Sequence, residues 1–204
     1  MNVHRLDPVE LRVLGCLVEK QRTTPEQYPL TLNALRLACN QSTNRDPVME
    51  LDESQVRHAA QSLGAKGYAR LATGPGSRTA KYRQLFQEAL DLMPAEVSIL
   101  AVLMLRGPQT AAELKTRTER LVSIDDVPAV LARLDEKELV HLLPRRPGQR
   151  EERWTHLLAE TPVEHAEEAD GDPAEPTPLD RRVAQLEERL EELERRLAER
   201  GLLD

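Results

Sequence analysis

The stretch Gly76-Ser-Arg-Thr-Ala-Lys-Tyr-Arg-Gln-Leu85 recurs later in the chain as Gly148-Gln-Arg-Glu-Glu-Arg-Trp-Thr-His-Leu157. The Gly, the Arg and the final Leu are identical, Lys81 matches Arg153, and Tyr82 matches Trp154. In each copy a Gly-containing basic turn joins two short extended segments, which predicts a β-hairpin. The repeat indicates that the chain contains one small unit twice.

The similarity extends upstream of both hairpins. Pro8-Val-Glu-Leu-Arg-Val-Leu-Gly-Cys-Leu17 aligns with Pro94-Ala-Glu-Val-Ser-Ile-Leu-Ala-Val-Leu103, and further matches pair Val56 with Val127, Leu63 with Leu134, and Lys66 with Lys137. A period of roughly 70 to 90 residues is too long for a solenoid and suits a duplicated domain. Apolar residues at helical spacing predict three helices before each hairpin, which is the plan of a winged helix.

We therefore predict an α+β protein, mostly α, with two tandem winged-helix domains. The first domain spans 1–90, with helices starting at Pro8, after Thr31, and at Asp52 or Ser54. The second spans 91–158, with helices over 94–106, 110–118 and 124–137 and a hairpin over 139–157. Residues 159–178 are rich in Glu, Asp, Ala and Pro, which predicts an acidic disordered linker with little to bury.

A heptad pattern over 179–201 predicts a C-terminal coiled-coil helix. In a parallel homodimer Arg182 would meet Glu187 of the other copy, and Arg189 would meet Glu194. The alternative is a single amphipathic helix that docks on its own domain or frays. The apolar heptad positions are Leu179, Val183, Leu186, Leu190, Leu193 and Leu197.

The composition excludes several classes of protein. Aromatic residues make up 2% of the 204 residues, so the core must consist of Leu, Val, Ile and Ala. Two cysteines, Cys16 and Cys39, lie in apolar helical patterns and predict buried thiols without a disulfide or a structural zinc site. No apolar run approaches the ~20 residues of a membrane span, and no signal peptide precedes the first helix, so we expect a cytoplasmic protein without a membrane contact.

The net charge of −7 is distributed unevenly along the chain. Residues 1–90 hold 12 Lys and Arg against 9 Asp and Glu, whereas residues 159–204 hold 6 against 15. Residues 91–158 are nearly balanced, with 10 against 11. The acidity therefore belongs mainly to the tail, and the first domain is mildly basic, as a module that contacts phosphate is expected to be.

A family resemblance supports this organisation. The run Glu19-Lys-Gln-Arg-Thr-Thr-Pro-Glu-Gln-Tyr-Pro-Leu30 and the run Ala38-Cys-Asn-Gln-Ser-Thr-Asn-Arg-Asp-Pro-Val-Met49 resemble the signature of the YceH-like bacterial proteins. The hairpin residues Arg78, Lys81 and Tyr82 and the run from Leu105 to Leu114 are also similar. The resemblance covers about residues 4–158 and implies a pair of winged-helix domains in a bacterial cytoplasmic protein, from a family with no agreed biochemical activity.

The first domain carries the chemistry needed to contact double-stranded DNA. A winged helix places its third helix in the major groove while the wing contacts phosphate, and Arg and Gln side chains bind guanine and adenine edges. The alternative is that these are ordinary solvated residues. The candidate contacts lie before the third helix (Asn44, Arg45), on it (Gln55, Arg57, His58, Gln61) and on the wing (Arg78, Lys81, Arg83).

The second domain differs in charge. Its third helix carries Asp125, Asp126, Asp135 and Glu136, with Glu138 following, and these carboxylates would be repelled by phosphate. Only its wing is basic, and it offers possible phosphate contacts at Arg145, Arg146 and Arg150. This domain is expected to bind the first domain or another protein.

The sequence offers no sign of catalysis. Glu19, Lys20, Glu26 and Tyr28 are ionisable, but a helix end followed by a proline-bounded loop favours a domain-packing element, with the Tyr28 hydroxyl bonded to backbone. The five histidines lack the spacing of a zinc site, and no phosphate-binding glycine loop precedes a helix. We therefore expect no enzymatic activity, no cofactor and no metal.

Two functional hypotheses follow. The first is a DNA-binding, transcription-regulator-like homodimer, and the rival is a protein–protein adaptor like the tandem winged-helix subunits of chromosome-organising complexes. For the loop from Asn40 to Met49 two interpretations stay open, a functional loop and a packed connector, with the second favoured.

Overall fold

The computed structural model describes residues 3–72, 79–145, 149 and 151–159. Within them the fold is α+β, with about half of the residues helical, seven α-helices and two small antiparallel sheets. All of the described residues belong to one unit, residues 1–164. No helix in this described part is both long and apolar enough to cross a bilayer.

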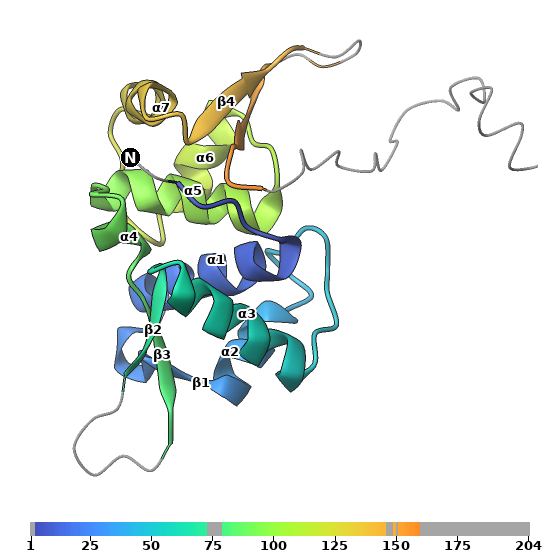
Figure 1. Cartoon of the computed structure of the whole chain (residues 1–204). Coiled ribbons are helices and arrows are strands. Elements are labelled where there is room, and N and C mark those ends of the chain that lie inside the picture. Colours follow the sequence, from blue (N-terminus) through green and yellow to red (C-terminus); the bar gives the residue numbers. More distant parts are fainter. Residues whose placement is uncertain (1–2, 73–78, 146–148, 150, 160–204) are drawn as a thin grey trace, which may run out of the picture. The chain divides into compact units, whose positions relative to one another are not determined.

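The first half runs helix, short strand, helix, helix, hairpin and then a one-turn helix (Figure 1). The β1 and β2 strands both pair with β3, so that the sheet order is β1-β3-β2. The elements are α1 (Pro8–Thr23), the 3₁₀ turn η1 (Pro25–Gln27), β1 (Leu30–Thr31), α2 (Leu32–Cys39), α3 (Glu53–Ala65), β2 (Ala69–Ala72), β3 (Lys81–Gln84) and α4 (Phe86–Ala89).

The second half repeats three helices and a hairpin. Its elements are α5 (Pro94–Arg106), α6 (Ala111–Thr118), α7 (Val127–Glu136), β4 (Val140–Leu143) and β5 (Arg153–His156). The helix expected over 94–106 has the bounds of α5, and those expected over 110–118 and 124–137 are slightly shorter in the structure. The sequence analysis did not predict β1 or α4. Strand β1 has only two residues and is defined by its pairing with β3 rather than by a local pattern.

The duplication extends to the register of the strands. Leu71 pairs with Tyr82 in the first hairpin, and Leu142 pairs with Trp154 in the second. The segment before the second helix also pairs with the same aromatic position, at Leu30 in the first half and as an isolated bridge at Gln109 in the second. The aromatic match seen in the sequence therefore marks equivalent positions in the two halves.

The same ion pair holds the first and third helices together in each half. The Glu10 carboxylate accepts a hydrogen bond from the Asp7 backbone N–H at 2.9 Å, as the glutamate of a capping box, and from Lys66 Nζ at 2.6 Å. Glu96 accepts from the Met93 N–H and from Lys137 Nζ, both at 2.8 Å. Both glutamate side chains are buried, so each one fixes a helix start and a helix end at once.

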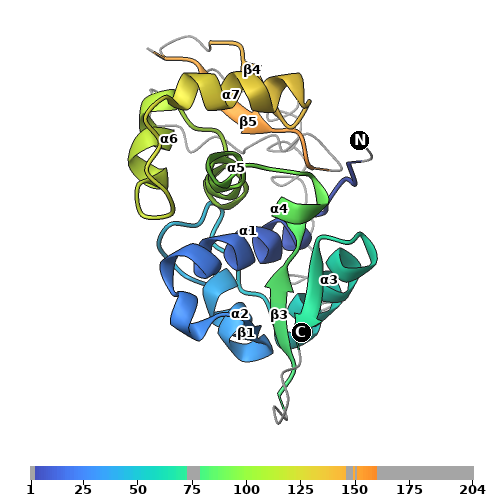
Figure 2. The ribbon, with the colours of Figure 1, turned by 90° about the vertical axis from the view of Figure 1, so that its left-hand side faces the viewer.

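The two halves join through α1 and α5, which lie side by side in both views (Figures 1 and 2). The α1 helix is buried from Glu10 to Glu19, and α5 from Glu96 to Leu105. Gly15 permits the close approach, because a Cβ atom there would lie 2.9 Å from both Cγ and Cδ2 of Leu105. One continuous hydrophobic core therefore runs through both halves.

Replacing Gly15 by Ala should weaken this contact. The added Cβ overpacks the side chain of buried Leu105, so we expect the free energy of unfolding to fall by about 1–3 kcal/mol in urea. Gly64→Ala is the control, because the nearest atom to its Cβ is 3.7 Å away and helix propensity should then stabilise the protein by about 0.5–1 kcal/mol. Equal stability of Gly15→Ala and the wild type would contradict the close packing of α1 on α5.

The second residue after the third helix has positive φ in both halves. It is Gly67 in the first half, at +77°, and Glu138 in the second, at +56°. Left-handed backbone costs an L-residue about 1–2 kcal/mol and glycine far less. We therefore expect Glu138→Gly to raise the free energy of unfolding by about 1 kcal/mol and Gly67→Ala to lower it by about as much, both in urea titrations; a destabilising Glu138→Gly would refute this account.

Candidate nucleic-acid interface

The α3 helix presents a polar face to solvent. Asp52 caps its start by accepting from the Gln55 N–H at 2.8 Å, and the Gln55 side chain accepts from the Asp52 N–H at 2.9 Å. Gln55, Arg57, His58 and Gln61 are all exposed, whereas Val56, Ala59, Ala60 and Leu63 are buried. Since Gln55 is engaged in the cap, Arg57, His58 and Gln61 are the side chains available to an outside partner.

Arg57 is held only weakly on this face. Its guanidinium lies 3.8 Å from the Glu53 carboxylate one turn earlier, and both side chains are more than half exposed. Exposed pairs of this kind contribute only about 0.3–0.5 kcal/mol. A phosphate or base edge that binds Arg57 can therefore displace Glu53 with little loss of free energy.

The β2–β3 hairpin has one basic face and one apolar face. Arg70 pairs with Arg83 and Ala72 with Lys81, so strand alternation places the three cations on the same side. Tyr82 and Gln84 point the other way and are buried. Arg83 binds Glu88 at 2.8 Å, while among the described residues neither Arg70 nor Lys81 has an ion-pair partner.

Arg70 was missed by the sequence analysis. Its signal was present, because it alternates with apolar neighbours in a segment expected to be a strand. What the sequence could not supply was the register that sets Arg70 opposite Arg83. The Arg70–Arg83 pair places two positive charges directly opposite each other on the same face of the sheet. Such a pair is unfavourable within a sheet, so an anion bound at this face would stabilise it.

Asn44 and Arg45, predicted to reach the DNA backbone, lie inside the junction of the two halves. Arg45 is 6% exposed, and its guanidinium donates to the Ala38 carbonyl at 3.1 Å and to Glu19 Oε2 at 2.6 Å. Asn44 accepts a hydrogen bond from Arg106 of α5. Arg45 therefore has no surface to offer to phosphate, and we leave both residues out of the interface.

Several hydrogen bonds anchor the loop from Asn40 to Met49 to its surroundings. The Asn40 side chain accepts from the Leu51 N–H and donates to the Leu51 carbonyl, and the Asp46 N–H donates to the Leu105 carbonyl at 2.8 Å. Buried Arg12 of α1 donates to the Cys39 and Pro47 carbonyls. The loop thus connects α1 and α2 to the end of α5.

Glu19 is the centre of a second junction contact. Its buried carboxylate accepts from Arg45 of the first half and from Arg120 of the second. Burial alone would raise the pKa of Glu19, but the hydrogen bond and charge of Arg45 and the charge of Arg120 outweigh burial and lower it. The prediction that Glu19 belongs to a domain-packing element is confirmed by this geometry.

Tyr28 also has the predicted structural role. Its hydroxyl oxygen accepts a hydrogen bond from the Gln84 N–H of β3 at 2.6 Å. Burial raises the pKa of Tyr28 to about 12, although the hydrogen bond from Gln84 opposes the shift. Tyr28 therefore stays neutral at physiological pH and fixes the loop after α1 to the sheet.

The surface around α7, in the second half, is acidic. Asp125, Asp126, Asp135, Glu136 and Glu138, on and around α7, are all exposed. Arg153, the counterpart of Lys81, donates to Glu113 and to the Pro108 carbonyl, both at 2.9 Å. The two hairpins therefore use equivalent cations differently.

Several predicted residues lie outside the described part of the chain. Arg145 is described and exposed, and it donates to the Gln149 carbonyl at 3.2 Å. The predicted residues that lie outside the described part of the chain are the wing arginines Arg78, Arg146 and Arg150, the linker from residue 160, and the heptad positions Leu179, Val183, Leu186, Leu190, Leu193 and Leu197.

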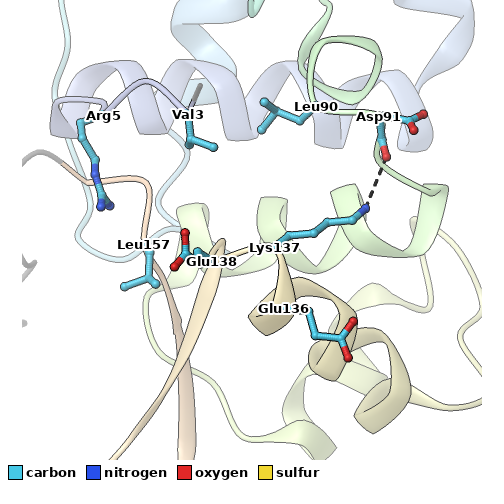
Figure 3. Close-up of a pocket in the computed structure, with 8 residues that line it drawn as sticks. All are labelled: Val3, Arg5, Leu90, Asp91, Glu136, Lys137, Glu138 and Leu157. Carbon is cyan, nitrogen blue, oxygen red and sulfur yellow. Dashed lines mark hydrogen bonds between the residues drawn. The ribbon is translucent and has the colours of Figure 1, made fainter. Parts of the chain in front are cut away.

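A cavity of about 600 Å³ lies between the start of the chain and the turn after α7 (Figure 3). Its lining mixes Arg5 and Lys137 with Asp91, Glu136 and Glu138. Lys137 reaches across to the Asp91 carbonyl at 3.4 Å and is already bound to Glu96. Among the described residues no His, Cys, Asp and Glu side chains form a group that could hold a metal ion.

Comparison with known proteins identifies the family to which this chain belongs. Residues 6–149 match the family described as "Protein of unknown function, DUF480". The chain belongs to the DUF480 family. The match begins just before α1 and ends in the turn of the second hairpin, so it covers the first half and the second half as far as β4.

Curated relatives of this DUF480 protein are similar over most of their length. A UPF0502 protein of Geobacter sulfurreducens is 51% identical over 173 residues, which cover 82% of this chain and 78% of the relative. One from Pseudomonas fluorescens is 45% identical over 205 residues, covering 93% and 94%. One from Solibacter usitatus is 48% identical over 195 residues, covering 94% of each chain.

The depressed pKa of Glu19 predicts a pH-dependent stability. The pKa of Glu10 is also lowered, because hydrogen bonds from Lys66, Ser62 and Asp7 outweigh its burial. A carboxylate with a folded pKa below its unfolded value contributes stability above the unfolded pKa and loses it as pH falls through the folded one. The free energy of unfolding should therefore decrease as the pH is lowered from about 5.

Glu19→Gln tests this assignment. We expect a loss of about 3 kcal/mol at pH 7, because buried Arg45 loses its counter-charge, and a shallower decline of stability on acidification. Glu26→Gln, which alters an exposed glutamate of η1, is the control. Parallel pH profiles for Glu19→Gln and the wild type in urea unfolding would argue against Glu19 as a stabilising carboxylate.

Proposed function

We propose that this protein binds double-stranded DNA through the first of two winged helices, as a non-enzymatic, cytoplasmic protein of the transcription-regulator type. The winged-helix assignment is supported by the repeated order of three helices and a hairpin. It is also supported by the extended segment before the second helix, which pairs with the returning strand in both halves.

The observation that carries the proposal is the basic face of the β2–β3 hairpin. Among the described residues Arg70 and Lys81 have no ion-pair partner, and Arg83 forms an ion pair with exposed Glu88. Phosphate contacts from such a wing supply affinity and position without reading sequence.

The exposed face of α3 supplies the reading chemistry. Arg57 can donate to guanine O6 and N7, and Gln61 can bind an adenine edge in the major groove. His58 adds a further donor beside them. The heptad residues 179–197 would join two copies, and a two-fold dimer would bind two half-sites.

The acidic surface around α7 favours a second candidate, a protein–protein adaptor. Five exposed carboxylates on and around one helix repel phosphate and suit a basic protein partner. In this candidate the second half contacts the partner, and the first half has no DNA contact.

Fluorescence anisotropy with a random-sequence duplex at several salt concentrations distinguishes the candidates. We expect binding that weakens with salt at a log–log slope of about −3 or steeper, because several phosphates are neutralised. Arg70→Gln should make the slope shallower by about 1. Lys115→Gln, which removes an exposed cation of α6, should leave the slope unchanged.

Base contacts are tested separately from phosphate contacts. Once a preferred sequence has been selected, Arg57→Gln should lower the affinity for it by about 1–3 kcal/mol and leave random duplex nearly unaffected. Absence of duplex binding at low salt would reject the DNA proposal and leave the adaptor candidate.

A further inference from the structure

A second cavity, of about 450 Å³, lies where the first half meets the end of α5 and α6. Its lining comprises Asn44, Arg106, Thr116, Arg117, Glu119 and Arg120. Three of these six side chains are arginines, from the end of α5 (Arg106), from α6 (Arg117) and from the turn after α6 (Arg120). We refer to this cavity as the arginine pocket.

The carboxylates near the arginine pocket are already shared. Glu19 binds Arg45 and Arg120, and it lies 4.0 Å from Lys20. Glu113 lies 3.6 Å from Arg117 and 2.9 Å from Arg153. Each of these two carboxylates therefore lies close to at least two cations. Glu119, the carboxylate in the pocket lining itself, is exposed.

Arg106 has no carboxylate partner among the described residues. Its guanidinium donates to Asn44 Oδ1, a neutral amide oxygen. Burial lowers the pKa of Arg106, and the positive charges of Arg117, Arg120 and Arg45 lower it further, whereas the charge of Glu19 opposes them. Three arginines line this cavity, and an anion bound among them would reduce their mutual repulsion.

We propose that the arginine pocket binds the phosphate group of a small anionic molecule. Guanidinium groups present planar pairs of N–H donors that match phosphate oxygens, and charge-assisted bonds of this kind are the strong ones. A phosphate carries up to two negative charges, so it offsets the excess of arginine better than a single carboxylate does. The volume lies within the range of small-molecule sites.

The pocket differs from a DNA contact in its shape and place. It is a cavity lined by residues of the junction, whereas the proposed DNA contacts lie on an exposed helix and hairpin face. A phosphate bound between Asn44 of the first half and Arg117 of α6 would connect the two halves. Ligand binding should therefore stabilise the folded junction.

Isothermal titration calorimetry of the full chain with inorganic pyrophosphate tests the site. We expect saturable one-to-one binding and an increase in melting temperature with pyrophosphate concentration. Arg106→Gln should weaken binding about tenfold or more, because it removes a charged donor whose only described side-chain partner is neutral. Its partner is not a buried carboxylate, so the variant should fold as the wild type does.

Arg70→Gln is the matched control and separates this proposal from the proposed DNA binding. Arg70→Gln should bind pyrophosphate as the wild type does while weakening duplex binding, and Arg106→Gln should show the reverse. Absence of pyrophosphate binding, or equal binding by the wild type and both variants, would overturn the arginine pocket. Loss of duplex affinity in Arg106→Gln without any pyrophosphate binding would also overturn it, since the pocket would then serve DNA phosphate.

Discussion

The close contact of α1 with α5 is the constraint on which the rest of the structure depends. Each of these helices is the first of its repeat, and each is buried along most of its length. A helix buried on every side needs partners in both halves, so neither half would retain a complete core without the other. Gly15 permits this contact at a position where most side chains would collide with Leu105.

Buried arginines border this contact, and most of their N–H groups have partners within the protein. Arg12 and Arg45 are buried, yet their guanidinium groups reach backbone carbonyls and, for Arg45, the Glu19 carboxylate. Breaking a buried pair leaves an uncompensated charge, which is strongly unfavourable. The loop between α2 and α3 is therefore anchored to the junction through Arg45, which pairs with Glu19, and through the Asp46 N–H, which donates to the Leu105 carbonyl.

The sequence predicted the helices well because their signals are local. Helix starts were expected at Pro8, after Thr31, and at Asp52 or Ser54, and in the structure Asp7, Thr31 and Asp52 cap these helices. The side chains facing outward on α3 also followed from periodicity alone. Signals of this kind involve residues within a few positions of one another.

The parts that could not be predicted depend on residues far apart in the chain. Arg45 looked like an exposed loop cation because its partner Glu19 is 26 residues away, and Arg120 lies 101 residues from the same carboxylate. The arginine pocket needs the placement of α6 beside the loop that holds Asn44. The two copies share the order of their elements and a buried Glu–Lys pair. Their surface charges differ: Lys81 lies on the basic face of the first hairpin, whereas its counterpart Arg153 binds Glu113. The two halves therefore share their packing and differ in their surface charge, and this difference is the basis for proposing separate roles for them.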